Sequence, residues 1–148
     1  MKTVIQRVSG ASLKVNGKPV SETGRGLVVY LGVESGDEPA CGEYLAGKIA
    51  KMRIFEDENG KMNVNPMDAG AASILLISQF TLFADCKSRR PGFSKAARPE
   101  KAIPLYEKVI ALCREKGFEV QTGEFGADML VASENDGPLT ILLDTNEL

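Results

Sequence analysis

Histidine is absent from this chain of 148 residues. Histidine is the commonest general base of enzymes, the usual partner of a nucleophilic serine or cysteine, and the commonest ligand of catalytic zinc. Its absence excludes Ser-His and Cys-His hydrolytic machinery and argues against a zinc centre. Any chemistry has to proceed without imidazole, and we expect neither a metal nor another cofactor.

Cysteines and long apolar runs are scarce as well. The three cysteines, Cys41, Cys86 and Cys113, are odd in number and widely spaced, which favours neither a disulfide framework nor a paired-thiol metal site. No apolar run approaches the roughly 20 residues that span a bilayer, and residues 1–4 lack the apolar core of a secretion signal. We therefore expect a cytoplasmic protein with reduced thiols and no membrane partner.

Phosphate-binding motifs are also missing. The sequence contains no Walker A loop, and no Gly-x-Gly-x-x-Gly follows a strand and opens a helix, so nucleotide hydrolysis is not expected. Residues 123–126, Gly-Glu-Phe-Gly, have the form of the loop that clamps nucleic acid in one RNA-binding module. That loop joins two helices, whereas strands are expected on both sides here, so a tight turn is the favoured interpretation.

What the chain does contain is an uneven distribution of charge. Its net charge of -2 argues against indiscriminate coating of nucleic acid, and we expect no DNA partner. Segment 87–101 nevertheless holds six basic side chains against the single acidic Glu100. The basic residues are Lys87, Arg89, Arg90, Lys95, Arg98 and Lys101. The segment is either a solvated loop or a surface for a polyanion.

The hydrophobic pattern predicts many strands. Period-two alternation and short apolar runs indicate strands, and Asn16-Gly17 and Asn59-Gly60 are typical of tight hairpins. The expected strands are 3–8, 11–15, 20–22, 27–33, 53–55, 61–63, 73–83, 118–121, 129–132 and 139–143. Run 73–83 is the longest and is expected at the centre of the sheet. We predict an α+β fold with a mostly antiparallel sheet and a single domain over residues 1–148.

Two amphipathic helices complete this prediction. Asp37 offers an N-cap for the first helix, which extends for about four turns to Met52. The second helix ends near Lys116, where Gly117 stops it. Pro104 has to lie in its first turn or kink it.

Two segments could carry chemistry. Residues 78–81, Ser-Gln-Phe-Thr, interrupt an apolar strand with polar groups, which cost free energy when buried unless they are satisfied or used. Strand alternation would place Ser78 and Phe80 on one face, and the segment is either a site or the point where the strand reaches solvent. Residues 135–138, Asn-Asp-Gly-Pro, are either an ordinary turn or a place where glycine lets the backbone approach a ligand.

Together these motifs resemble those of the D-aminoacyl-tRNA deacylase family, and the resemblance spans nearly the whole chain. The segments that carry it are Ile5-Gln6-Arg7-Val8, Arg53-Ile54-Phe55, Gly60-Lys61-Met62-Asn63, Ser78-Gln79-Phe80-Thr81-Leu82, Ala84-Asp85, Arg90-Pro91, Phe93-Ser94, Phe125-Gly126-Ala127-Asp128-Met129 and Asn135-Asp136-Gly137-Pro138. Several motifs in the right order are more specific than any one of them. The resemblance implies a barrel-like, mixed sheet with two main helices.

The resemblance also implies an activity and an assembly. The family removes D-amino acids from tRNA, and glycine mischarged on tRNA-Ala, while rejecting L-aminoacyl-tRNA. It implies a homodimer with shared active sites, in which a cis Gly137-Pro138 bond of one subunit faces Ser78 to Thr81 of the other. Main-chain carbonyl oxygens of that turn would clash with an L-side chain, so selection works by steric rejection.

Roles for individual residues follow from the same resemblance. The catalytic segment is Ser78, Gln79, Phe80 and Thr81, with main-chain amides near Phe80 holding the carbonyl oxygen and the terminal 2'-hydroxyl of the RNA helping to activate water. The residues implied in substrate binding are Arg7, Phe125, Met129 and Asn135, with Arg7 bracing the turn. The residues implied in RNA binding are Lys87, Arg89, Arg90, Lys95 and Arg98. For Phe125 and Met129, core packing is the alternative interpretation.

One departure from the family and two rival functions remain. Gly92 stands where the family usually has serine, which removes a hydroxyl from the basic loop.

One rival function is a non-catalytic RNA-binding module, which would bind tRNA without turnover. The other is a small-molecule esterase that uses Thr81, although a threonine hydroxyl is a weak nucleophile without an adjacent base.

Overall fold

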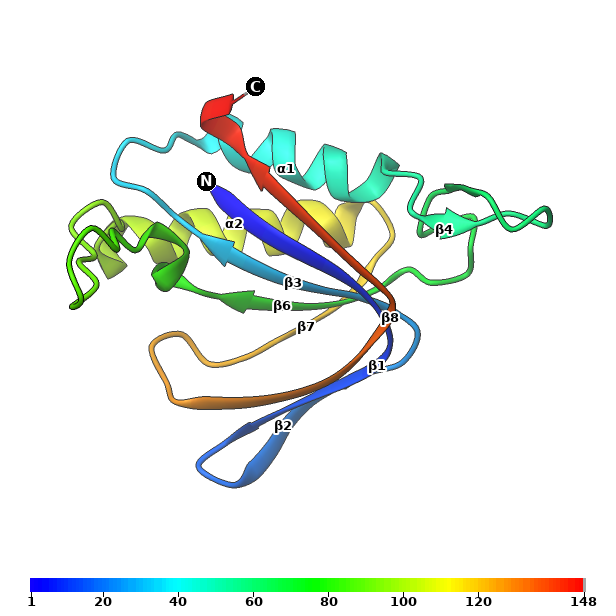
Figure 1. The fold of residues 1–148 in the computed structure, drawn as a ribbon, viewed down its shortest axis with the longest axis horizontal. Helices are drawn as coiled ribbons and strands as arrows, with labels where there is room; N and C mark the ends of the chain where they lie inside the picture. The colour runs from blue at the N-terminus through cyan, green and yellow to red at the C-terminus, as the bar shows by residue number, and fades with distance from the viewer. Residues whose placement is uncertain (148) are drawn as a thin grey trace.

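A computed structural model describes residues 1–147 as a curled sheet with two helices over one of its faces (Figure 1). The strands are β1 (Lys2–Val15), β2 (Lys18–Thr23), β3 (Gly26–Gly32), β4 (Phe55–Glu56), β5 (Met62–Val64), β6 (Ser73–Ser78), β7 (Glu119–Thr122) and β8 (Met129–Asp144). The helices are α1 (Pro39–Lys51) and α2 (Pro99–Glu115), with 3-10 turns η1 (Phe80–Phe83) and η2 (Thr145–Glu147). None of the helices in this part of the chain is both long and apolar enough to cross a bilayer.

The main sheet is mixed and nearly closes on itself. Its order is β2-β1-β3-β6-β7, with β8 paired to β1, and the β3–β6 and β6–β7 pairs are parallel. The hydroxyl of Ser21 on β2 donates a hydrogen bond to the carbonyl of Thr122 on β7, which brings the two ends of the sheet together. The predicted α+β, barrel-like fold with two main helices is confirmed by this architecture. Strands β4 and β5 form a separate hairpin beyond the end of α1 (Figure 1).

Two apolar clusters hold the sheet in place. The larger lies between the sheet and the helices, where Ile5, Val29 and Leu76 pack against side chains of α1 and α2. The expected stripe of α2 points into this cluster, since Tyr106, Val109, Ile110 and Cys113 are buried. The smaller cluster fills the concave side between β1, β3 and β6, and it includes Leu13, Val28 and Ile77. Strands β3 and β6 are therefore apolar on both faces, as the continuous apolar runs predict.

The ends of the chain contain two strands longer than expected. Runs 3–8 and 11–15 belong to one strand, β1, which pairs with β3 along its first half and with β2 along its second half. Runs 129–132 and 139–143 also belong to one strand, β8, which follows β1 along its length. Residues 135–138 are therefore not a turn between strands. Gln6 pairs with Thr140 and Val8 with Asn135, so residues 136–139 bulge from β8 opposite Arg7; this segment is called the Gly-Pro bulge below.

The expected strand 73–83 is too long. Strand β6 ends at Ser78, and residues 80–83 form the 3-10 turn η1, so the predicted alternation of side chains from Ser78 to Thr81 does not occur. The strand ends because polar residues follow the buried Ile77 where the chain reaches the surface, and Phe80 is 53% exposed. Strand β6 does lie inside the sheet, between β3 and β7.

The expected start of helix α1 is also corrected. Helix α1 has Glu38 as its N-cap, not Asp37, and no side chain among residues 1–147 caps it. Asp37 instead accepts hydrogen bonds from the α-ammonium of Met1 at 2.6 Å and from the amide of Glu34 at 2.7 Å, so a buried ion pair uses its carboxylate. Helix α2 begins at Pro99, so Pro104 lies in its second turn, which excludes the first of the two places expected for this proline. Gly117 follows the helix with a φ of 99°, as a C-terminal stop requires.

Helix α2 buries two side chains that can lose a proton, Tyr106 and Cys113, and their burial predicts a loss of stability at alkaline pH. Burial raises the pKa of the Cys113 thiol from 9.0 to about 11 and the pKa of the Tyr106 hydroxyl from 10.0 to about 12. The folded state therefore keeps these protons when the unfolded chain loses them. Their contribution to stability is fully present below pH 9 and is lost as pH rises from about 9 to 12.

Urea unfolding between pH 8 and 11 measures this effect. The free energy of unfolding is expected to fall less steeply with pH in Cys113→Ala than in the natural chain, by roughly 1–3 kcal/mol over the range. Cys86→Ala is the matched control, because Cys86 is exposed. Parallel pH profiles for all three proteins would contradict the assignment.

Candidate functional site

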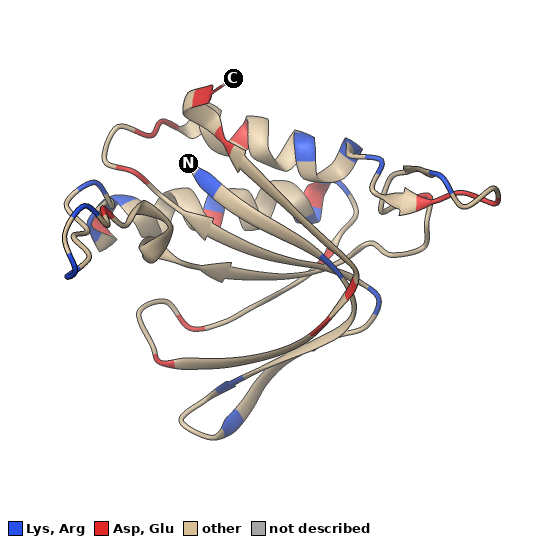
Figure 2. Ribbon diagram, in the orientation of Figure 1, with Lys and Arg blue, Asp and Glu red and all other residues tan. Residues whose placement is uncertain are grey.

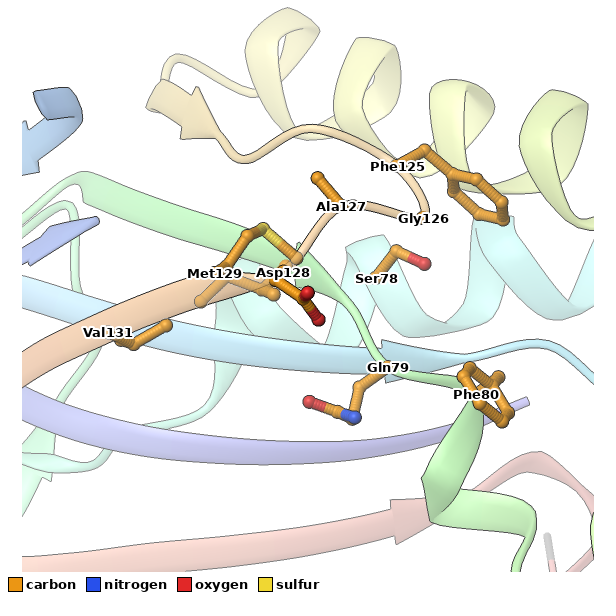
Figure 3. A pocket seen from close by; sticks show the side chains of 10 residues that line it. Ser78, Gln79, Phe80, Phe125, Gly126, Ala127, Asp128, Met129 and Val131 are labelled. Carbon is orange, nitrogen blue, oxygen red and sulfur yellow. The ribbon is translucent and has the colours of Figure 1, made fainter. Parts of the chain in front are cut away.

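A cavity of about 320 Å³ opens where β6 ends beside the loop between β7 and β8. One wall is the end of β6 and the start of η1, and the other is the segment from Phe125 to Val131 (Figure 3). The lining residues are Ile77, Ser78, Gln79, Phe80, Phe125, Gly126, Ala127, Asp128, Met129 and Val131. The structure thus brings together two of the motifs on which the sequence prediction depends.

The β6 side of the cavity presents polar groups at its mouth. The amide nitrogen of the Gln79 side chain donates a hydrogen bond to the Thr81 hydroxyl at 2.5 Å, and both groups are near the surface. The N–H groups of the first turn of any helix have no partner within it, and Gln79 as N-cap makes no side-chain bond to those of η1. Within residues 1–147, the amides of Phe80 and Thr81 therefore have no partner inside this turn and can face a ligand. Thr81 does not line the cavity.

The opposite wall combines packing with exposure. Phe125 is half-buried, and its ring centroid lies 6.3 Å from that of Tyr106, so it packs on the main core while it lines the cavity. Met129 packs on the smaller cluster and lines the cavity as well. The two interpretations of these residues, core packing and pocket lining, are therefore compatible. Asp128 is exposed and is the one ionisable side chain among the lining residues (Figure 3).

The basic segment lies beside this cavity. Residues 87–98 form a loop between η1 and α2, and Lys101 lies in the first turn of α2. Figure 2 shows lysines and arginines gathered at this end of the molecule. The side chains of Lys87, Arg89, Arg90, Lys95 and Arg98 are all exposed. The Phe93 ring of this loop meets the Phe80 ring edge to face at 5.1 Å, which connects the loop to η1.

Gly92 has a structural role in the basic segment. Its amide donates to the Asp85 carbonyl at 2.9 Å and its carbonyl accepts from the Asp85 amide at 2.7 Å, which closes the loop between them. A Cβ atom added at Gly92 would meet no atom of the described residues within 4 Å. The loop therefore tolerates a serine there, and its conformation does not require glycine.

Side chains of β1 and β8 contact the Gly-Pro bulge and hold it in place. The side-chain nitrogen of Asn135 donates to the carbonyls of Arg7 and Leu139, both at 3.0 Å, and so ties the two ends of the bulge together. Arg7 is 7% exposed, and its Nε lies 3.2 Å from the Asp136 carboxylate. The Gly137-Pro138 peptide bond is cis, and both residues are exposed.

The bulge and the cavity lie apart within one chain. None of the residues that line the cavity belongs to segment 135–140. In Figure 1 the bend of β8 lies on the right, at the opposite end of the sheet along the strands from η1 and from the loop before β8. The structure therefore brings Ser78, Gln79, Phe80, Phe125 and Met129 together, and it separately brings Arg7 and Asn135 to Gly137 and Pro138.

Several neighbours of these groups are not predicted by the sequence. Asp128 and Val131 line the cavity, and the signal for Asp128 was its position inside a motif that was already recognised. Arg25 and Phe55 lie next to Arg7 beneath the bulge, and no sequence pattern indicated that proximity. Within residues 1–147, no cluster of three or more Cys, Asp or Glu side chains is arranged to hold a metal ion.

Known proteins are similar to this chain over almost its full length. The family model described as D-Tyr-tRNA(Tyr) deacylase matches residues 4–144. A D-aminoacyl-tRNA deacylase of Dehalococcoides mccartyi is 51% identical over 148 residues, which cover 99% of this chain and 96% of that protein.

Solved structures show the same fold. The c-Myc DNA Unwinding Element Binding Protein superposes with a TM-score of 0.91 and 39% identity, covering 98% of this chain and 99% of the other. A probable eukaryotic D-amino acid tRNA deacylase superposes with a TM-score of 0.83 over 96% of this chain and 97% of its own, and its 18% identity supports the fold alone.

Proposed function

This chain belongs to the D-Tyr-tRNA(Tyr) deacylase family, and from that premise we propose how its cavity and its Gly-Pro bulge divide the work of the enzyme. It is a D-aminoacyl-tRNA deacylase, a hydrolase that acts on aminoacyl-tRNA esters. The cavity beside Ser78 to Phe80 receives the aminoacyl ester, and the bulge selects its chirality. RNA supplies the part of the chemistry that the side chains lack.

The chirality filter acts between two copies of the chain. The observation that carries this proposal is the separation of the exposed bulge from the cavity of its own chain. In a homodimer with shared active sites, the bulge of one subunit closes the cavity of the other. The main-chain carbonyls of Gly137 and Pro138 then clash with an L-side chain but leave room for a D-residue. Glycine has no side chain to reject, so glycine mischarged on tRNA-Ala is a second substrate.

Hydrolysis at this site depends on the RNA. An ester needs a positioned water, a proton acceptor and stabilisation of the developing oxyanion. Main-chain amides near Phe80 hold the carbonyl oxygen, and the 2'-hydroxyl of the terminal adenosine helps to activate the water. Thr81 has a positioning role, because its hydroxyl accepts a hydrogen bond from the side-chain amide of Gln79, which is not a base.

The remaining contacts hold the tRNA end. Phe125 and Met129 lie on the wall that receives the terminal adenosine. The exposed lysines and arginines of segment 87–98 contact acceptor-stem phosphates, which give affinity without reading the sequence.

The activity assay compares D-Tyr-tRNA with L-Tyr-tRNA. The D-ester is expected to be hydrolysed at least about a hundredfold faster in kcat/KM, which corresponds to roughly 3 kcal/mol of discrimination in the transition state. Binding of both substrates without turnover would instead favour a non-catalytic RNA-binding module. Equal kcat/KM for the D- and L-esters would contradict the proposed chirality filter.

A further inference from the structure

The guanidinium of Arg7 connects the Gly-Pro bulge to the segment that follows α1. Its Nη1 donates a hydrogen bond of 2.7 Å to the carbonyl of Ile54. Its Nε lies 3.2 Å from the Asp136 carboxylate, yet within residues 1–147 no group accepts a hydrogen bond from that buried nitrogen. The contact with Asp136 is therefore an ion pair without directional bonding. One directional bond does not fix the plane of a long side chain, so another contact has to orient it.

The ring of Phe55 supplies that contact. It is 1% exposed, and its centroid lies 5.9 Å from the Arg7 guanidinium carbon, within the range of a cation–π interaction. The guanidinium carbon of Arg25 lies 5.1 Å from the same centroid. Arg25 in turn donates a hydrogen bond of 2.5 Å to the carbonyl of Ala69, which holds it over the ring.

The charges around the ring are balanced. Two cations near one ring repel each other, and carboxylates close by offset that repulsion. Glu56 and Asp136 line a small cavity of about 110 Å³ together with Arg7, Arg25 and Phe55. The bulge is thus supported by a layer of side chains drawn from β1, the β2–β3 loop and the β4–β5 hairpin.

We propose that Phe55 and Arg25 are positioning residues for the chirality filter, which they stiffen through Arg7. This inference rests on the proposed role of the Gly-Pro bulge. Steric rejection works only while the wall does not yield, because the penalty for an L-substrate cannot exceed the free energy needed to displace the bulge. Loosening the support should therefore admit L-aminoacyl-tRNA while leaving hydrolysis of the D-ester nearly unchanged.

The test measures kcat/KM for D-Tyr-tRNA and L-Tyr-tRNA, with the melting temperature, in Phe55→Leu and Arg25→Gln. We expect the D/L selectivity to fall about tenfold in Phe55→Leu and about threefold in Arg25→Gln, through faster cleavage of the L-ester. Arg25→Lys keeps a cation near the ring and should restore most of the selectivity. Arg25 is exposed, so its variants test the inference even if Phe55→Leu does not fold.

Matched controls separate positioning from stability. Phe118→Leu removes another ring of the main core, where Phe118 is 4% exposed. Lys48→Gln removes a cation that lies 5.6 Å from the Tyr44 ring on α1. Both should leave the selectivity unchanged. The inference is wrong if Phe55→Leu and Phe118→Leu lower the melting temperature alike and neither changes the selectivity.

A Gly137→Ala variant separates the proposed filter, the Gly-Pro bulge, from its proposed support by Phe55 and Arg25. If it loses selectivity while Phe55→Leu and Arg25→Gln keep it, the filter stands and the support layer does not. If Gly137→Ala also discriminates like the natural chain, the bulge is not the filter, and the proposed function fails together with the inference.

Discussion

Hydrolysis of a D-amino acid ester on a 2'-deoxy terminal adenosine should be about a thousandfold slower than hydrolysis of the natural ester, since a general base contributes roughly two to four orders of magnitude. The chain has no histidine, and Asp128 is the one ionisable side chain among the residues that line the cavity. The hydroxyl of Thr81 is engaged by Gln79 and lies outside the lining. The protein therefore offers few groups that could replace the 2'-hydroxyl.

Single-turnover rates on the two substrates, with matched D-Tyr esters, measure this effect on kcat separately from binding. Thr81→Ala should retain activity within about tenfold, because we assign its hydroxyl no covalent role. A loss of more than about a thousandfold, or roughly 4 kcal/mol of transition-state stabilisation, would contradict the absence of a covalent role for Thr81. Asp128→Asn tests the carboxylate as the base: if the natural chain still cleaves the 2'-deoxy ester and Asp128→Asn cleaves neither ester, the carboxylate is the base.

The parts of the fold that the sequence predicts well are those governed by local rules. Strand β3 is predicted because a short apolar run is buried on both faces, and the hairpin after β1 because Asn16 and Gly17 accept positive φ angles, which are 50° and 77° in the structure. The end of α2 shortly before Gly117 follows from the same kind of local conformational preference.

The errors arise where a distant partner decides the local structure. Asp37 is a residue type that often caps helices, but its carboxylate accepts a hydrogen bond from the α-ammonium of Met1 instead. Residues 135–138 have the composition of a turn, yet β1 pairs with β8 on both sides of them, so they become a bulge. The layer of Arg25 and Phe55 beneath Arg7 joins three segments far apart in the chain, and no periodicity within any one of them indicates it.

Gly137→Ala should lower the D/L selectivity by about a hundredfold, which corresponds to roughly 3 kcal/mol. Gly137 has a φ of 125°, a conformation that L-residues rarely adopt. A Cβ there would lie 2.9 Å from the Leu139 amide nitrogen and 3.1 Å from Arg7 Nη2. The amide is backbone and Arg7 is confined by its buried surroundings, so the bulge itself has to shift. Its carbonyls then leave the position from which they reject an L-side chain.

Measuring both esters with Gly137→Ala and Gly60→Ala separates this effect from general backbone strain. Gly60 has a φ of 73° at the tip of the β4–β5 hairpin, and an added Cβ would meet nothing within 4 Å. Its replacement imposes comparable strain, of order 1–3 kcal/mol, without moving the bulge. We expect Gly60→Ala to lose stability but keep its selectivity. Equal selectivity in the two variants would mean that chirality is read elsewhere in the site. The wall of the cavity from Phe125 to Met129 would then be the next candidate for the filter.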